Sequence, residues 1–330
     1  MKDNNPIMVS IHCLVYNHEA YLRQCLESIL MQKTCFRFEV IVHDDASTDG
    51  SATIIQEFAS RYPSIIKPIF EKENQYSKHD DSLDRIMLNH TRGVFVAFCE
   101  GDDYWTNPHK LQIQYDAMMD NPDCTIAFAK VLKVNRVGEW NGLAIPSDRF
   151  IKAGKVSLST YLEEEFYYGR WAFHTLSFFI RKNVMDDYLW FRYSLLKDFP
   201  YGDMPIALQC LRKGNGIYID EVVGSYRMFS GGYNSGLASN ARAALDDRRK
   251  LIRGFNVFDE YTDYKYHRFI ERRITRTELE IGIIEKNRKE IIKPKYYKVV
   301  LQRNWRGRLL YLINVISPSL YNIITTKFRH

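Results

Sequence analysis

The first 130 residues alternate short apolar runs with amphipathic helical patterns, and this alternation limits the fold more than any other feature of the chain. The runs are MVSIHCLVYN, FEVIVHDD, IIKPIFE and VFVAFCEGDD, and helical patterns lie in HEAYLRQCLESILMQ, in STDGSATIIQEFASRYP and, more weakly, over 79–92. Strands that alternate with helices indicate parallel βαβ units. We therefore expect an α/β fold with a doubly wound sheet covered on both faces, in which Pro68 marks the third strand as an edge strand.

Polar residues follow three of these predicted strands. YNHE follows the first strand, HDDASTD the second and EGDDYW the fourth. Because ligands of open α/β sheets collect at the carboxyl ends of the strands, the three loops predict one binding edge. Surface loops are polar in most proteins, but ordinary loops would be scattered over both ends of the sheet.

The stretch FCEGDDYW places Glu100, Asp102 and Asp103 within four residues, directly after an apolar run. Like charges this close repel one another and resist burial, so they require either bulk water or a cation. Hard carboxylate oxygens favour magnesium or manganese.

Beyond residue 107 the pattern is less regular. We expect a helix in 108–122 with Pro108 in its first turn, a strand in 124–135, an irregular aromatic stretch over 140–175, and a strand in TLSFFIRK. GDMPIALQCLRKGNG predicts a helix that ends at glycines, GIYIDEVVGSYRM a final strand or pair, and the tail from about residue 240 is mostly helical.

Charge is divided unevenly along the chain. The net charge is +6, but residues from 241 onward carry 21 Lys and Arg against 10 Asp and Glu, and residues 291–330 carry eight basic side chains and no acidic one. A segregated basic end predicts an anionic partner. The six cysteines form no CxxC pair and fit small buried thiols, and neither a secretory signal nor a spanning apolar stretch is apparent, so we expect a cytoplasmic protein.

The loops in this order resemble the family 2 glycosyltransferases, which are inverting enzymes with a GT-A fold. The resemblance covers roughly residues 7–235 and depends on VYNHEAYLRQCLESILMQ, DDASTDGS, RGVFVAFCEGDDYW and GDMPIALQCLRKG. FCEGDDYWTNPHKLQ is similar to bacterial surface-polysaccharide transferases. The resemblance to family 2 implies a Rossmann-like, mostly parallel mixed sheet in a catalytic domain, residues 1–240. This domain has a nucleotide-sugar half (1–130) and an acceptor half (131–240). A helical basic extension, 241–330, follows.

The resemblance implies the site residues. Six residues are expected to hold a nucleotide-diphospho-sugar, with a UDP-sugar favoured: Tyr16, Glu19, Asp44, Asp45, Glu100 and Asp102. Asp102 and Asp103 are the candidate ligands of Mn²⁺ or Mg²⁺. Glu100 replaces the first acid of the family's Asp-x-Asp and could instead orient the ribose, and Phe229 stands where many relatives have a metal-binding His. For Ser47 and Asp49 we favour helix capping over ligand contact.

The family's catalytic acid corresponds to Asp203, at the start of a predicted helix. As general base it would take the proton of the acceptor hydroxyl, and the helix start is expected to lower its pKa. Helix capping is its competing role, and Asp198 and Asp220 are weaker candidates for the base. Trp171 and His174 are expected to bind the acceptor, because sugar C–H faces stack on aromatic rings, although dense aromatics are as often core.

The basic tail and the function each leave alternatives open. The tail could bind an anionic membrane surface, pack on the catalytic core or pair with another protomer; no nucleic-acid recognition module is apparent. The favoured function is inverting sugar transfer to a saccharide acceptor, expected to be lipid-linked, in surface polysaccharide synthesis. The alternatives are a non-catalytic nucleotide-sugar-binding or assembly protein and a sugar-1-phosphate nucleotidyltransferase, although LVYNHEAY lacks the glycine-rich loop typical of that class.

Overall fold

The computed structural model describes residues 6–147, 151–200, 202–228, 240–302, 305–317 and 324. These residues divide into two compact units. The first contains residues up to 161, residues 171–195 and residues 202–228, and the second contains residues 162–170, residues 196–200 and the chain from residue 240 onward. Two short segments of the predicted catalytic domain therefore belong to the same unit as the C-terminal helices.

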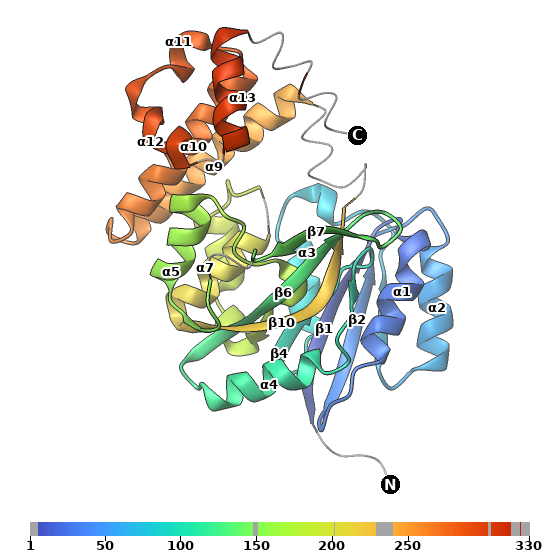
Figure 1. The fold of residues 1–330 in the computed structure, drawn as a ribbon. Helices are drawn as coiled ribbons and strands as arrows, with labels where there is room; N and C mark the ends of the chain where they lie inside the picture. The colour runs from blue at the N-terminus through green and yellow to red at the C-terminus, as the bar shows by residue number, and fades with distance from the viewer. Residues whose placement is uncertain are drawn as a thin grey trace. The chain divides into compact units, whose positions relative to one another are not determined.

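The first unit is built on one mixed sheet with the strand order β3-β2-β1-β4-β9-β6-β10-β5, while β7 pairs with β6 and β8 with β10 (Figure 1). β1, β2, β3 and β4 run parallel, as the sequence predicts, and β3 lies at the edge. The strands are β1 (Ile7–Val15), β2 (Arg37–Asp44), β3 (Ile66–Phe70), β4 (Phe95–Phe98), β5 (Tyr104–Trp105), β6 (Cys124–Val134), β7 (Trp140–Ile145), β8 (Gly154–Val156), β9 (Phe179–Arg181) and β10 (Asn215–Arg227).

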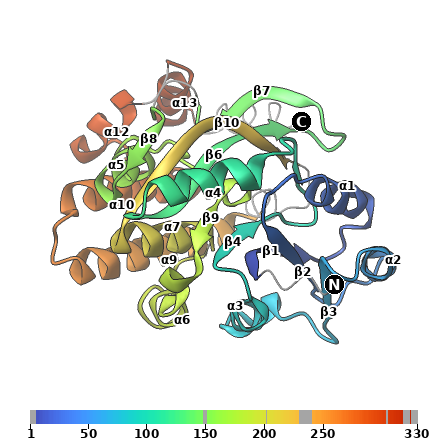
Figure 2. The same ribbon diagram turned by 90° about the horizontal axis from the view of Figure 1, so that it is seen from below.

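Helices cover both faces of this sheet (Figure 2). Buried side chains of α1, α2 and α4 form one core with β1, β2, β4 and β6, whereas α3 packs Leu83 and Met87 on Ile41 at the other face. The helices of this unit include α1 (Glu19–Leu30), α2 (Ser51–Arg61), α3 (Ser82–His90), α4 (Lys110–Asp120), α5 (Leu158–Leu162), α6 (Tyr188–Trp190) and α7 (Asp203–Lys213), together with the short turns η1 (Tyr76–Lys78), η3 (Thr175–Ser177), η4 (Lys182–Met185) and η5 (Phe191–Leu195).

Two local expectations need correction. Pro108 lies before α4 instead of in its first turn, because the helix begins only at Lys110. The stretch 140–175, expected to be irregular, contains β7, β8 and α5, since β7 folds back antiparallel on β6. Of the two possibilities left open for GIYIDEVVGSYRM, a strand or a pair, the structure has one strand, β10, which pairs with β6 along its length with local register shifts.

The second unit is helical. α9 (Ala241–Tyr261) and α10 (His267–Ile284) are its long helices, followed by α11 (Arg288–Ile291), η6 (Pro294–Tyr296), α12 (Tyr297–Gln302) and α13 (Trp305–Ile316), with η2 (Glu163–Tyr168) as an earlier segment of the chain. Arg276 of α10 joins η2 by donating to the carbonyl oxygens of Phe166 and Tyr167 at 3.0 and 2.9 Å. The expected helical tail is thus present over the described residues.

Candidate active site

Three loops meet at one edge of the sheet, as the polar segments of the sequence predict. β1 lies between β2 and β4 and is parallel to both, so the residues after Val15, Asp44 and Phe98 leave the sheet side by side. Two backbone contacts tie the loops to β1: the N–H of Asp45 donates to the carbonyl oxygen of Val15, and the N–H of Gly101 donates to that of Leu14, both at 2.9 Å.

One carboxylate, that of Asp49, serves the starts of two helices. Its Oδ2 accepts the N–H of Glu19, the first residue of α1, at 3.0 Å, and its Oδ1 accepts the N–H of Ser51, the first residue of α2, at 2.9 Å. Burial alone would raise the pKa of Asp49, but these hydrogen bonds outweigh it and lower the pKa. The capping role expected for Asp49 therefore matches its contacts, and Ser47 Oγ accepts the N–H of Asn17 at 2.9 Å.

Glu19, which is predicted to bind the nucleotide sugar, connects the first two loops. Its Oε2 accepts the N–H of Gly50 at 2.9 Å, and a Cβ atom at position 50 would lie 2.4 Å from Oε1. Only glycine therefore fits at this position without a shift. Tyr16, at the end of β1, keeps 47% of its side chain exposed and remains available to a ligand at the same edge.

Asp44 and Asp45 are adjacent but have different surroundings. Asp44 is 3% exposed, and its Oδ1 has no hydrogen-bond partner within the described part of the chain. Asp45 uses both oxygens on the loop after β3, accepting the N–H groups of Gln75 at 2.6 Å and Tyr76 at 3.0 Å. An unpartnered buried acceptor is costly, and Asp44 keeps an oxygen that accepts no donor from the described residues, whereas Asp45 positions Tyr76.

Tyr76 is a candidate site residue that the sequence analysis missed. Its side chain is 54% exposed, and partial burial together with the charge of Glu100 raises the pKa of its hydroxyl, which places Tyr76 close to the acidic cluster. The available signal was a polar loop after the third strand, at the same sheet edge as the other three.

The acidic cluster brings together carboxylates from distant parts of the chain. The side chain of Glu100 is open to solvent, yet the protein atoms around its carboxyl group raise its pKa to about 7, with further contributions from the charges of Asp102 and Asp203. The side chain of Asp102 is 20% exposed, and its Oδ2 lies 3.9 Å from Nε2 of His18, a neighbour that the sequence analysis did not assign. The predicted base therefore lies within electrostatic reach of the predicted metal loop.

Asp103 points into the protein instead of toward this cluster. It is 2% exposed, and its Oδ1 accepts the backbone N–H of Arg227 at 2.8 Å. Burial and the charge of Asp102 raise its pKa well above the usual value. The Arg227 guanidinium donates to the carbonyl oxygen of Asp102 at 2.9 Å and to Gln24 Oε1 at 2.8 Å, so this residue joins the end of β10 to the acidic loop and to α1.

Asp203 begins α7 as predicted, and its Oδ1 accepts the N–H of Met204 at 2.8 Å. The expectation that the helix start lowers its pKa is wrong: burial raises the pKa, and the backbone hydrogen bonds offset this only in part. Of the alternatives, Asp220 is exposed and paired with Lys130, and Asp198 belongs to the other unit and is paired with Arg253.

The predicted acceptor residues form an aromatic group with Tyr226. The His174 ring lies 4.2 Å from the Tyr226 ring and 5.4 Å from the Trp171 ring, centroid to centroid, and Lys133 Nζ lies 4.7 Å from the centre of Trp171. His174 is buried, and burial followed by the charge of Lys133 lowers its pKa to about 3. His174 is therefore neutral and accepts the N–H of Leu176, while Trp171 is half-buried.

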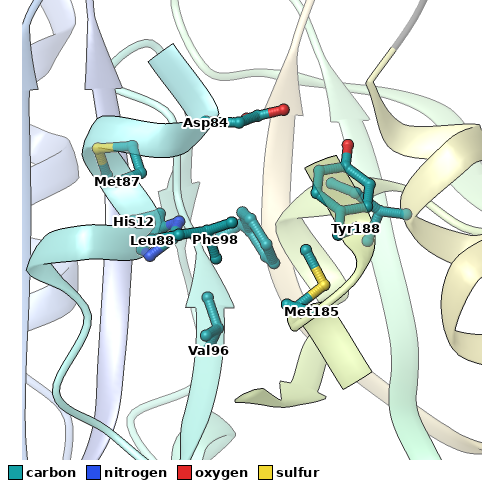
Figure 3. Close-up of a pocket in the computed structure, with 9 residues that line it drawn as sticks. His12, Asp84, Met87, Leu88, Val96, Phe98, Met185 and Tyr188 are labelled. Carbon is teal, nitrogen blue, oxygen red and sulfur yellow. The ribbon is translucent and has the colours of Figure 1, made fainter. Parts of the chain in front are cut away.

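A small cavity lies between β1, β4, α3 and the segment around Tyr188 (Figure 3). It has room for about one water molecule, far less than a nucleotide sugar needs. Its lining includes His12, whose Nε2 lies 2.8 Å from Thr91 Oγ1, and Asp84, whose Oδ2 accepts the Tyr193 hydroxyl at 2.7 Å. This cavity is therefore separate from the open acidic edge.

A family model described as glycosyl transferase family 2 matches residues 10–187, more than half of the chain. The chain belongs to glycosyl transferase family 2. The match spans the three loops, Trp171 and His174, and it ends before Asp203, Tyr226 and Arg227. The fold class and the family inferred from the sequence are thereby confirmed.

Curated relatives of this family 2 chain include uncharacterised and named proteins. It is 42% identical over 37% of its length to the uncharacterised protein Rv1520 of Mycobacterium tuberculosis, and 32% identical over 59% of its length to the minor teichoic acid biosynthesis protein GgaA of Bacillus subtilis. The chain spans 35% of the first relative and 45% of the second.

Solved structures share the fold at low sequence identity. The S. aureus TarS 1-349 structure has a TM-score of 0.56 at 16% identity, covering 94% of this chain and 80% of that one. The mannosyltransferase PcManGT from Pyrobaculum calidifontis, in complex with GDP-Man and Mn²⁺, has a TM-score of 0.55 at 16% identity, covering 97% and 90%. At such identity the similarity establishes the fold alone.

Across the described ranges, no three His, Cys, Asp or Glu side chains are arranged to hold a metal ion by themselves. Nor does any helix in those ranges have the length and apolar character needed to cross a membrane. Phe229, where many relatives were expected to have a metal-binding His, lies outside the described residues, as does the rest of SYRMFSGGYNSG from residue 229 onward.

Proposed function

We propose that this chain transfers a sugar from a nucleotide-diphospho-sugar to a saccharide acceptor, with inversion, in the synthesis of a surface polysaccharide. The observation that carries the proposal is the electrostatic contact of Glu100 with both Asp102 and Asp203. One loop thus supplies carboxylates suited to the donor's diphosphate, and a helix more than 100 residues away supplies a base. The family membership and the name of GgaA support the same chemistry.

The donor is assigned to the edge formed by the first two loops and the loop after β3. The free oxygen of Asp44 is suited to accept an N–H group of the base, and the exposed rings of Tyr16 and Tyr76 offer stacking surfaces. Glu19 and Asp45 act on the donor through the loops they hold. A UDP-sugar remains the favoured donor, and structures of the similarly folded TarS were solved with UDP and with UDP-GlcNAc.

A divalent cation fits Glu100 and Asp102. Both side chains offer hard oxygens, and the charge of Asp102 opposes ionisation of Glu100, a repulsion that a cation would relieve. Two carboxylates do not complete a site, which agrees with a metal that takes its remaining ligands from a diphosphate. Mn²⁺ or Mg²⁺ bound there would neutralise charge on the departing diphosphate. The contact of Asp103 with Arg227 favours a role in shaping the loop over a role as ligand.

Asp203 is assigned as the general base. As the acceptor oxygen attacks the anomeric carbon, the bond from that carbon to the diphosphate oxygen breaks, and the proton of the acceptor hydroxyl passes to the carboxylate of Asp203. A raised pKa brings this carboxylate closer to neutrality and makes it a stronger base than an ordinary aspartate. The half-buried ring of Trp171 is assigned to the acceptor, with His174 holding it from the buried side.

The acceptor is proposed to be lipid-linked, at the cytoplasmic face of a membrane. Support comes from the basic residues 291–330 and from the teichoic acid pathway named for GgaA.

The proposal is tested with a panel of nucleotide sugars and Mn²⁺, measuring thermal stabilisation of the purified chain and release of nucleoside diphosphate with lipid-extract acceptors. We expect one nucleotide sugar both to stabilise the chain and to be turned over. Stabilisation without turnover would instead indicate a non-catalytic binding protein. Release of pyrophosphate from a nucleoside triphosphate and a sugar 1-phosphate would indicate a nucleotidyltransferase.

A further inference from the structure

Helix α13 turns its apolar side chains outward. Trp305, Leu309, Leu312 and Ile316 are 68%, 48%, 53% and 73% exposed. Their spacing of four, three and four residues places them on one face of the helix. An exposed, continuous apolar face is uncommon on a protein surface and marks an interaction site.

The opposite face of α13 is buried, and Tyr311 and Val315 pack there with Leu279 and Ile291. Asn314 is 1% exposed and Tyr311 is 7% exposed, and the Tyr311 hydroxyl donates to the carbonyl oxygen of Ile291 at 2.8 Å. A helix at a water-exposed surface normally has polar groups outward and apolar groups in the core. Asn314 is buried while four apolar residues of the same helix are exposed. This arrangement indicates that the exposed face of α13 contacts an environment less polar than water.

Helix α12 extends the same feature. Tyr297 and Leu301 lie one turn apart and are 53% and 61% exposed. The Arg308 guanidinium of α13 donates a hydrogen bond to the carbonyl oxygen of Leu301 in α12. Both helices are drawn in red in Figure 1. We call the six exposed apolar residues the tail face: Tyr297, Leu301, Trp305, Leu309, Leu312 and Ile316.

Positive charge surrounds the tail face. Lys298, Arg306 and Arg308 are exposed on the same two helices, and the Arg306 guanidinium lies 5.4 Å from the centre of the Trp305 ring. No acidic residue occurs in 291–330. The two acidic side chains nearest in sequence are already engaged, since Glu290 pairs with Lys293 and Glu285 with Arg249. The rim of the face is therefore cationic.

We propose that the tail face docks on a lipid surface that contains anionic headgroups. The apolar residues would enter the boundary of the acyl chains while the Lys and Arg side chains contact the headgroup phosphates. A second copy of the chain fits less well, because a twofold contact would bring the cationic rims together. The inference deepens the proposed function, since it explains how the chain would reach a lipid-linked acceptor.

The test compares two double variants of the full chain in flotation with vesicles of phosphatidylcholine containing about 30% phosphatidylglycerol. Leu309→Ser/Leu312→Ser alters the tail face. Val137→Ser/Leu143→Ser is the matched control, because these residues are 77% and 55% exposed but lie in the first unit. We expect the tail-face variant to bind the vesicles about tenfold or more weakly than the wild type, and the control to bind as the wild type does.

Charge is tested separately with Lys298→Gln/Arg306→Gln. Each lost charge should weaken binding to the anionic vesicles about fivefold, with little effect on binding to phosphatidylcholine alone. Circular dichroism and thermal unfolding of each variant check that the fold is intact. Release of nucleotide from a nucleotide sugar, measured without vesicles, reports the proposed function independently, so failure of one proposal is distinguishable from failure of the other.

The proposal is overturned if the wild type does not float with anionic vesicles at low salt, or if a folded tail-face variant floats equally well. It is also overturned if analytical ultracentrifugation shows a wild-type dimer that the tail-face variant abolishes while vesicle binding is absent. In that case the tail face would be an interface between copies of the chain.

Discussion

The carboxylate of Asp103 accepts the backbone N–H of Arg227 at 2.8 Å, although 124 residues separate them in the chain. This contact joins the acidic loop after β4 to the last residue of β10 and directs the side chain of Asp103 away from that of Asp102. Arg227 completes the link by donating to the carbonyl oxygen of Asp102. The position of Asp102 at the candidate active site thus depends on a buried neighbour.

Asp103 can be tested by comparing Asp103→Asn with Asp103→Leu. Asparagine keeps an oxygen that accepts the Arg227 N–H and avoids burying a charge, so its unfolding free energy should stay near that of the wild type. Leucine leaves the N–H unpaired in a buried site, and we expect a loss of about 1–3 kcal/mol. Urea unfolding measures both. Equal stability of the two variants would contradict a supporting role for the contact.

Asp203→Asn should retain donor affinity and lose transfer by about 100-fold or more, because an amide cannot accept the proton of the acceptor hydroxyl. Its oxygen can still accept the N–H of Met204, so the fold should be unaffected. Asp220→Asn is the control, since Asp220 is exposed and paired with Lys130. Steady-state kinetics and donor titration decide the assignment, which would fail if both variants transferred sugar at similar rates.

The pH dependence of kcat/KM should show the environment of Asp203. The base works only when deprotonated, and burial raises its pKa, so activity should fall on acidification at a higher pH than for an ordinary aspartate. Glu100, whose pKa is about 7, should add a second titration to the acid limb of the profile. The variant Glu100→Gln should remove that second titration. A wild-type acid limb near the usual value of about 4 would contradict the burial of the base.

Asp44 and Asp45 should respond differently to alanine. Asp44→Ala removes an oxygen without a partner, so we expect stability near the wild type but donor affinity lowered about tenfold or more. Asp45→Ala unties the loop that carries Tyr76 and should lower both stability and donor affinity. Thermal unfolding and nucleotide titration separate the two outcomes. Loss of stability in Asp44→Ala would show that its role is structural.

Gly169 should be far less tolerant of alanine than Gly142. Both have positive φ angles, of 66° and 82°, which cost an alanine about 1–2 kcal/mol. A Cβ at Gly169 would also lie 1.9 Å from a guanidinium nitrogen of Arg276, whereas one at Gly142 meets nothing within 4 Å. Gly169→Ala should therefore disturb the two hydrogen bonds from Arg276 to η2, and it should lower the melting temperature more than Gly142→Ala does.

Much of the fold and of the binding edge could be predicted from the sequence, because the signals are local. Alternating apolar runs and helical periods identified the strands that became β1 to β4, and parallel strands bring their carboxyl ends to one edge. The start of α7 at Asp203 was predicted from its amphipathic pattern and the family motif. The composition of the tail predicted a basic helical region, and its helices are present.

Tertiary structure alone decided the pairing of distant segments and the direction of individual side chains. β9 runs antiparallel between β4 and β6, a choice that depends on partners far away in the chain. No period fixes where a loop carboxylate points, so the inward turn of Asp103 and the free oxygen of Asp44 appear only in the structure. The sequence predicted a helical tail, but only packing showed that Asn314 is buried while Leu312 is exposed.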